Sequence, residues 1–147
     1  MAGFNFNNFL QGAMGNYSEK TIDELNQEYG MYLFEDETIT MGFQLIRDAL
    51  LITSLRIIFI DKQGATGKKT SFKTIFLDSV INVEMETAGV GIDDSEITIT
   101  FIENAYQKSN NELLREATFE FPKRTDLTEI YRVLGNISVN NRERINR

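Results

Sequence analysis

The segment KQGATGKKTSFK, residues 62–73, holds the side chains of this chain that are best suited to bind an anion. It has no acidic residue, although the whole chain carries a net charge of −7. Ammonium groups bind phosphate as point charges, and the glycines of the segment would let backbone N–H groups approach an anion. The lysines of the segment are Lys62, Lys68, Lys69 and Lys73.

Two interpretations of this segment stay open. The first is an anion-binding or headgroup-binding hairpin, to which a neighbouring turn would add Arg47. The second is a solvated hairpin whose lysines protect a strand edge. The neighbouring turn is short and places Asp48 beside Arg47, so it offers few convergent donors. The sequence therefore favours the solvated hairpin.

The fragment GATGKKT matches the phosphate-binding P-loop only in part. The glycine that should precede Gly67 by five residues is Lys62, and Lys68 is followed by Lys69 instead of Ser or Thr. A strand follows the fragment, where a P-loop needs the N-terminus of a helix. The sequence therefore gives no support to nucleotide hydrolysis.

Side chains for catalysis and metal binding are scarce. The chain has no histidine and no cysteine, which excludes thiolate nucleophiles, histidine acid–base catalysis, disulfides and nearly all transition-metal sites. Asp93, Asp94 and Glu96 lie close together, but they lack the loop spacing and terminal bidentate Glu of a calcium loop, so we interpret them as an acidic turn. We predict a protein that is not an enzyme and that has no cofactor and no metal site.

The charge balance and the apolar runs limit the partners. With 15 Lys and Arg against 22 Asp and Glu, the chain lacks the positive field that nucleic-acid binding needs. No basic region followed by an apolar run opens the chain, and the apolar run at Ala49–Ile60 is too short and too interrupted to span a bilayer. We expect a cytoplasmic protein with no nucleic-acid partner.

The elements that would position these residues form a single domain at residues 18–140. Ser18 is a candidate helix cap, and Ile22, Leu25 and Tyr29 form the buried stripe of a first helix, which Gly30 ends. Alternation of apolar and polar residues, or short apolar runs, then predicts half-buried antiparallel strands. The predicted strands are Thr38–Ile46, Leu50–Thr53, Arg56–Asp61, Phe72–Leu77, Ile81–Glu86, Ile97–Phe101 and Ala117–Phe121.

The strands of the Leu50–Ile60 region are apolar on both faces. Either a helix covers their outer face or another subunit does. In the second case Leu51 and Ile58 would lie in a subunit interface. Phenylalanines and methionines with two-residue periodicity elsewhere are interpreted as core. These are Phe34, Met41, Phe43, Phe59, Phe76, Met85, Phe101, Phe119 and Phe121.

A C-terminal helix is predicted after Pro122. Thr125 would cap it, and an apolar stripe would face the core, with a polar tail at residues 141–147. The residues of this stripe are Leu127, Ile130, Tyr131, Leu134 and Ile137.

The first seventeen residues form an uncharged segment rich in Phe, Asn and Gly. Its Phe4, Phe6 and Phe9 would make an adhesive surface if they were left exposed. They either lie on the domain itself or contact another subunit or a membrane, and the lack of Lys and Arg counts against the membrane.

The pieces LIRDALLIT, RIIFIDKQGATGKKT and VEMETAG closely resemble the bacterial pleckstrin-homology-like (PH-like) domain family. The resemblance implies a mainly β fold, in which two nearly orthogonal antiparallel sheets of about seven strands form a barrel with a C-terminal helix at one end. The predicted order of helix, seven strands and helix agrees with this fold and adds an N-terminal helix. The family also implies a non-catalytic protein that assembles into rings, with five subunits as the expected arrangement.

Two functional hypotheses follow. The first is a homo-oligomeric protein-interaction module, with Phe4, Phe6, Phe9, Leu51 and Ile58 as interface candidates. The second is an anion-binding or acidic-headgroup-binding module that uses the lysine segment of residues 62–73.

Overall fold

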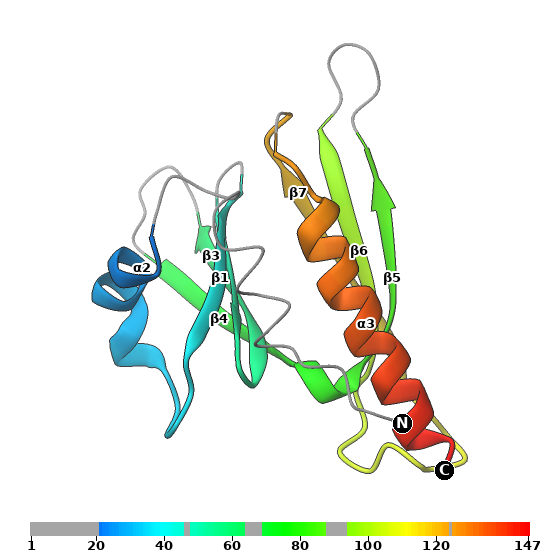
Figure 1. Cartoon of the computed structure of the whole chain (residues 1–147). Coiled ribbons are helices and arrows are strands. Elements are labelled where there is room, and N and C mark those ends of the chain that lie inside the picture. Colours follow the sequence, from blue (N-terminus) through cyan, green and yellow to red (C-terminus); the bar gives the residue numbers. More distant parts are fainter. Residues whose placement is uncertain (1–20, 46–47, 64–68, 88–93, 124) are drawn as a thin grey trace.

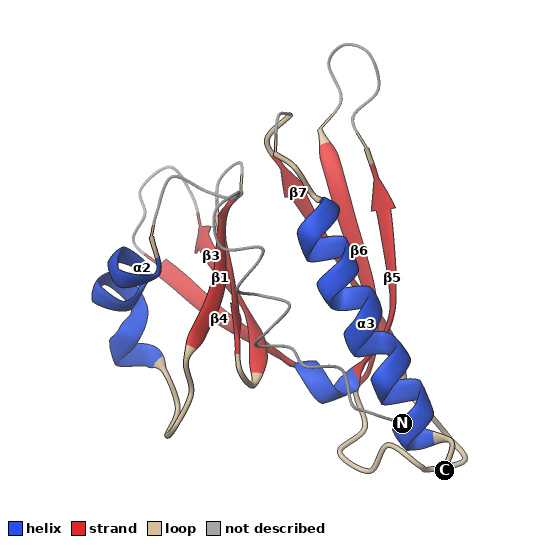
Figure 2. Ribbon diagram, in the orientation of Figure 1, coloured by secondary structure: helices blue, strands red, loops and turns tan. Residues whose placement is uncertain are grey.

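The computed structural model describes residues 21–45, 48–63, 69–87, 94–123 and 125–147. Within them, seven strands form two antiparallel sheets, with helices before the first sheet and after the second (Figures 1 and 2). The helical elements are α2 (Ile22–Tyr29), the 3-10 turns η1 (Gly30–Tyr32) and η2 (Leu77–Ser79), and α3 (Thr128–Ile145). The strands are β1 (Ile39–Gln44), β2 (Ala49–Thr53), β3 (Arg56–Gln63), β4 (Lys69–Phe76), β5 (Val80–Glu86), β6 (Ser95–Ile102) and β7 (Leu114–Phe121). The expected fold class is therefore confirmed.

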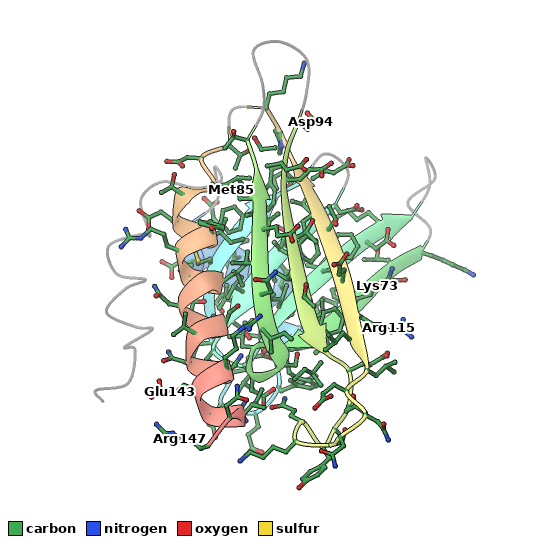
Figure 3. The ribbon with its side chains drawn as sticks, turned by 90° about the vertical axis from the view of Figure 1, so that its right-hand side faces the viewer. Lys73, Met85, Asp94, Arg115, Glu143 and Arg147 are labelled. Atoms are coloured by element: carbon green, nitrogen blue, oxygen red, sulfur yellow. The ribbon has the colours of Figure 1, made fainter. Side chains whose placement is uncertain are left out.

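The first sheet has the strand order β1-β2-β3-β4 and the second has the order β5-β6-β7. Within each sheet, consecutive strands of the chain pair with each other in antiparallel orientation. Only Ser54 and Leu55 lie between β2 and β3. Figure 3 looks onto the second sheet from outside and shows that its strands cross those of the first sheet.

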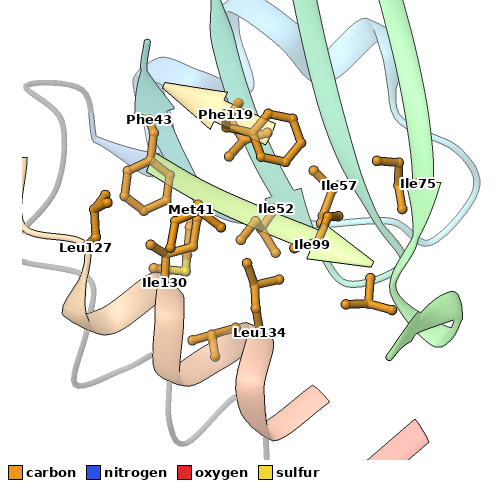
Figure 4. Close-up of a cluster of buried hydrophobic side chains, with 14 of the residues drawn as sticks. Met41, Phe43, Ile52, Ile57, Ile75, Ile99, Phe119, Leu127, Ile130 and Leu134 are labelled. Atoms are coloured by element: carbon orange, nitrogen blue, oxygen red, sulfur yellow. The ribbon is translucent and has the colours of Figure 1, made fainter. Parts of the chain in front are cut away.

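The main hydrophobic core lies between the two sheets and α3. Figure 4 shows Met41 and Ile52 of the first sheet opposite Ile130 and Leu134 of α3, with Ile99 of the second sheet beside them. All five are at most 1% exposed. Burial of such side chains supplies most of the driving force for folding.

The outer face of the first sheet is apolar as well, and α2 covers part of it. Leu25 and Tyr29 of α2 pack with Leu51 of β2 and with Ile58 and Ile60 of β3 in a second buried cluster. Of the two alternatives for this face, the structure shows the covering helix. All five residues of β2 are buried because the strand has a core on each side.

A capping box defines the start of α2. The Thr21 hydroxyl accepts a hydrogen bond from Glu24 N at 3.2 Å, and the Glu24 carboxylate accepts one from Thr21 N at 3.3 Å. These bonds satisfy donors that a helix N-terminus leaves open. The predicted cap, Ser18, lies outside the described residues.

Helix α3 starts later and ends later than the sequence pattern predicted. It begins at Thr128, whose N–H donates to Asp126 Oδ1 at 2.9 Å, whereas Thr125 was expected to cap it. Residues up to Ile145 are helical, which replaces most of the expected polar tail. On the buried face Val133 takes the place expected for Tyr131, which is 38% exposed.

Side chains in the last turns of α3 attach it to the start of the second sheet. Asn141 Nδ2 donates to the carbonyl oxygens of Leu77 and Val80, at 2.7 Å each. Arg142 Nε donates to Ile81 O at 2.6 Å. These bonds explain why a polar segment without an apolar stripe remains helical and packed.

Two aromatic residues expected in the core are on the surface. Phe34 and Phe76 are each 51% exposed. In β4 the buried position is Ile75, so Phe72 and Phe76 point to the other face of the strand. The remaining members of the expected set are buried or packed against the core. No helix in the described part of the chain is long and apolar enough to cross a bilayer.

Candidate interaction surface

A buried ion pair holds the loop between η1 and β1 against the first sheet. Glu37 of this loop is 6% exposed, and Arg56, the first residue of β3, is 4% exposed. Arg56 Nε donates to Glu37 Oε2 at 2.8 Å, and Arg56 Nη2 donates to Glu37 Oε1 at 3.1 Å. A bidentate arginine–carboxylate pair of this kind fixes the orientation of both groups.

Two further N–H groups of Arg56 are also in use. Nη1 donates to Thr74 Oγ1 of β4 at 2.7 Å, and Nη2 also donates to Tyr32 O at 3.0 Å. The Phe34 ring lies over the guanidinium, with 3.6 Å between the guanidinium carbon and the ring centroid, which is a cation–π contact. Arg56 therefore positions Tyr32 and Phe34 relative to β3 and β4.

The carboxylate of Glu37 has partners beyond Arg56. The Thr53 hydroxyl donates to Oε2 at 2.5 Å, and Phe34 N donates to Oε1 at 2.8 Å. Burial alone would raise the pKa of Glu37, but the hydrogen bonds from Arg56, Thr53 and Phe34 N together with the charge of Arg56 hold this pKa below its usual value. Glu37 is therefore a buried carboxylate that stays ionised.

Exposed apolar side chains gather around this ion pair. The rings of Tyr32 and Phe72 are 4.3 Å apart between centroids. Tyr32, Leu55 and Phe72 are 45%, 43% and 37% exposed, beside the half-exposed Phe34 and Phe76. We call these residues the aromatic patch: Tyr32, Phe34, Leu55, Phe72 and Phe76.

The aromatic patch lies at an open edge of the first sheet. Phe72 pairs with Ile60 and Phe76 pairs with Arg56 across the β3–β4 ladder, so the patch is on the outer face. Strand β4 is the last in the order β1-β2-β3-β4, and α2 packs chiefly on β1. The patch therefore continues the apolar outer face beyond the part that α2 covers.

A groove adjoins one end of the aromatic patch, and we call it the α3 groove. Its volume is about 410 Å³. It lies between the β2–β3 turn, the β4–η2 junction and the second half of α3, and Asp78 is the charged residue among those that line it. The lining residues are Ser54, Leu55, Phe76, Leu77, Asp78, Ile137, Asn140 and Asn141.

The outer face of the second sheet has the opposite character (Figure 3). Glu86, Glu96 and Glu120 occupy one cross-strand row of β5, β6 and β7, and Thr98 and Thr118 share a hydroxyl hydrogen bond of 2.8 Å in the next. Like charges in adjacent strands repel each other. Among the described residues, no group of three or more Asp, Glu, His or Cys side chains is arranged to hold a metal ion.

The lysine hairpin does not bring its described lysines together on one face. Lys62 pairs with Thr70 and shares the outer face with Ile60, whereas Lys69 and Lys73 point to the inner face. Lys73 Nζ lies 3.4 Å from Asp61 Oδ2 and 5.6 Å from the Phe59 ring centroid. Arg47 and Lys68 lie outside the described residues, and anion binding stays a prediction.

The interface candidates of the sequence are divided between two places. Leu51 and Ile58 are 1% and 2% exposed and lie beneath α2. Contact of these two side chains with another subunit would require α2 to move, and their interface role stays a prediction. Phe4, Phe6 and Phe9 lie outside the described residues.

The sequence pattern missed the ion pair and the aromatic patch. Arg56 was predicted only as the first residue of a strand. An arginine that an apolar strand buries needs an acidic partner, and this rule is the signal that could have predicted a pair with an upstream acid such as Glu37. The positions of Phe34 and Tyr32 depend on the fold of the η1–β1 loop, which has no periodicity.

The model of the family described as "Bacterial PH domain" matches residues 8–138 of this sequence. The chain belongs to the bacterial PH domain family. The protein of Bacillus subtilis (strain 168) called "Uncharacterized protein YjqA" is 40% identical over 91 residues, which cover 62% of this chain and 73% of that protein.

Crystal structures of bacterial PH domains share the fold. A DUF1696 family protein with a pleckstrin-homology domain from Shewanella loihica PV-4 is 33% identical, with a TM-score of 0.61, and the match covers 84% of this chain and 98% of that one. A pleckstrin homology domain from Shewanella amazonensis SB2B is 31% identical, with a TM-score of 0.63, and the match covers 88% of this chain and 98% of that one. None of these descriptions names a catalytic activity.

Proposed function

We propose that this bacterial PH domain is a non-catalytic, self-associating interaction module whose contact surface is the aromatic patch. The observation that carries the proposal is the pair of exposed aromatic side chains Phe72 and Phe76 on the outer face of the edge strand β4, with Tyr32 and Phe34 beside them. Exposed apolar groups of this kind mark interaction sites more often than isolated exposed residues do.

The composition of the patch favours a protein partner. Aromatic residues and arginine are enriched at the centres of interfaces, where they supply most of the binding energy. The patch contains four aromatic side chains around Arg56. Because Tyr32 and Phe34 are positioned by the buried ion pair, they would lose little conformational freedom on binding.

The position of the patch favours contact with a different surface of a second copy. The far edge of β4 has no strand partner among the described residues, so its backbone groups can take part in the contact. Such a heterologous contact repeats from copy to copy and closes into a ring when the rotation permits. A ring is also the assembly that the family resemblance implies, with five subunits as the expected number.

The test is the native mass of the full chain, measured by light scattering behind a sizing column. The test variant carries Phe72→Thr and Phe76→Thr, which keep strand propensity but remove the apolar groups. The matched control carries Leu113→Thr and Leu114→Thr, at residues with similar exposure in the β6–β7 connection and the start of β7. We expect a multimer for the natural chain and the control, and a smaller particle for the test variant.

Two results would contradict the proposal. A monomeric natural chain would rule out self-association. A multimer that survives both patch substitutions would show that the subunits meet elsewhere. Circular dichroism of all the variants checks that the fold is retained, and the half-exposed positions of Phe72 and Phe76 make a folding defect an unexpected outcome.

A further inference from the structure

The α3 groove has the features of a site for an apolar chain segment. Its walls include Leu55, Phe76, Leu77 and Ile137, and its volume of about 410 Å³ is within the range of about 300 to 1,000 Å³ that is typical of ligand pockets. Leu55 and Phe76 are about half exposed, so the groove is apolar and open. An apolar occupant would remove this surface from water.

The rim of the groove offers hydrogen bonds that suit a peptide backbone. Asn141 uses its amide nitrogen for Leu77 O and Val80 O, and its amide oxygen has no donor among the described residues. The side-chain amide of Asn140 also has no partner within the described part of the chain. The amide oxygen of Asn141 can accept a hydrogen bond from a backbone N–H group, and the amide of Asn140 can pair with both N–H and C=O groups of a peptide in the α3 groove.

The chain itself contains a segment of matching chemistry. Residues 1–17 carry no charged side chain and include Phe4, Phe6 and Phe9. Among the residues that line the groove, Asp78 alone is charged, and it is exposed to solvent, so a neutral segment meets no buried charge in the groove. Apolar side chains and neutral amides are what the groove can accept.

The length of the chain before α2 is sufficient to reach the groove. The first described residue is Thr21, and twelve positions separate it from Phe9. Twelve residues can span up to about 40 Å, whereas a domain of this length has a radius of gyration of about 15 Å. Phe9 can therefore reach the groove of its own domain from the start of α2.

From these observations we propose that residues 1–17 bind in the α3 groove of their own chain, with Phe6 and Phe9 as the apolar anchors. The segment shields Leu55 and Phe76 at one end of the aromatic patch and leaves Tyr32 and Phe72 open. Its removal exposes an apolar groove that can accept a similar segment from another chain.

Tryptophan fluorescence with a nitroxide quencher can test whether residues 1–17 occupy the α3 groove. The natural sequence has no tryptophan and no cysteine, so Phe9→Trp gives a single emission probe and Val139→Cys gives a single site for a nitroxide quencher. Val139 is 60% exposed on α3 beside Asn140, where a label does not fill the groove. The matched control places the nitroxide at Glu84→Cys, an exposed position of β5 on the outer face of the second sheet.

We expect the tryptophan at position 9 to have blue-shifted emission that the label at position 139 quenches and the label at position 84 does not. Leu55→Ser should move the emission toward the red, because it removes apolar wall from the groove. A mixture of tryptophan chains with separately labelled chains should show no quenching, since the contact is within one chain.

Two outcomes would overturn the inference. Emission typical of a solvent-exposed tryptophan would show that the segment does not occupy the groove. Quenching of tryptophan chains by separately labelled chains in the mixture would place the segment on a second copy, where Phe4, Phe6 and Phe9 would be interface residues. Light scattering on the same samples reports self-association separately, so a monomer with strong quenching would refute the proposed function and leave this inference intact.

Discussion

The outer face of the first sheet contains two regions with similar composition and different environments. Over β1, β2 and β3, the side chains of Ile39, Leu51 and Ile58 lie beneath α2 and are nearly inaccessible to water. Along β4, Phe72 and Phe76 stand on the same face and are 37% and 51% exposed. The sheet is apolar across its whole width, but a helix of eight residues covers only part of it.

The boundary between the two regions is the Glu37–Arg56 ion pair. Arg56 stands next to Phe76 in the ladder and contacts Thr74, while Glu37 belongs to the loop that returns from α2 to β1. A buried ion pair is weak evidence for stability, because desolvation of both charges offsets most of their attraction. Its geometry specifies position, and here it holds Tyr32 and Phe34 over the open region. The same apolar face is therefore core under α2 and is exposed to solvent beyond it.

The largest expected effect is from a charge placed in the covered region. Ile58→Glu puts a carboxylate beneath α2 with no partner, and we expect the chain to lose its fold. Phe72→Glu on the same face of the neighbouring strand should change the free energy of unfolding by less than about 1 kcal/mol, since its side chain can reach water. Circular dichroism and urea unfolding of dilute samples measure whether each of these two variants folds and how stable it is. A folded Ile58→Glu chain would show that α2 does not cover this position in solution.

The second largest effect is expected from loss of the Glu37–Arg56 ion pair at the boundary between the two regions. Arg56→Met leaves the Glu37 carboxylate buried and unpaired, which should lower the free energy of unfolding by about 3–5 kcal/mol. The matched control is Arg115→Met, which breaks the exposed ion pair between Arg115 Nε and Glu103 Oε2, 2.6 Å apart. This control should change the free energy of unfolding by about 0–1 kcal/mol. The double variant Glu37→Gln with Arg56→Met should recover part of the loss. Equal losses for Arg56→Met and Arg115→Met in urea unfolding would mean that the buried pair does not hold the loop.

Periodicity was sufficient to predict most of the fold. Alternation and, for β2 and β3, short apolar runs together predicted all seven strands, because each strand has at least one face in a buried cluster. The ends of the helices were less accurate. The sequence offers Thr125 as a cap, but Asp126 accepts the N–H of Thr128 and Leu127 is buried, so the helix begins at Thr128.

The surface was harder to predict than the core. Phe76 has the type and spacing of a core residue, but Ile75 is the residue of β4 that faces the second sheet, and periodicity alone does not say which of two apolar neighbours is inside. The ion pair joins residues nineteen positions apart through an irregular loop, so no local pattern encodes it. The composition of the lysine segment suits an anion, but composition does not give the direction of each side chain, and the described lysines are divided between two faces of the hairpin.

A third effect tests how closely α2 approaches the covered region. A Cβ atom at Gly42 of β1 would lie about 2.4 Å from Leu25 Cδ1 and 3.2 Å from Leu51 Cδ2. Gly42→Ala should therefore push α2 outward and lower the free energy of unfolding by about 1–3 kcal/mol. Combination with Leu25→Ala should cost less than the sum of the two single changes, because the smaller side chain makes room. Additive losses in urea unfolding would mean that Leu25 and Gly42 are not in contact.

The smallest effect is the pH dependence that Glu37 contributes. Its pKa in the folded protein is lower than the usual value of a glutamate, so the stabilisation is fully present above the pKa of the unfolded chain and is lost as pH falls through the folded pKa. We expect the free energy of unfolding to decrease below about pH 4.5, more steeply in the natural chain than in the Glu37→Gln, Arg56→Met double variant. Other carboxylates titrate in both proteins, so the difference between the two curves isolates Glu37. Parallel curves across this pH range would show that Glu37 has the same pKa in the folded and unfolded chains, and that the boundary of the aromatic patch is no more strongly paired than an exposed carboxylate.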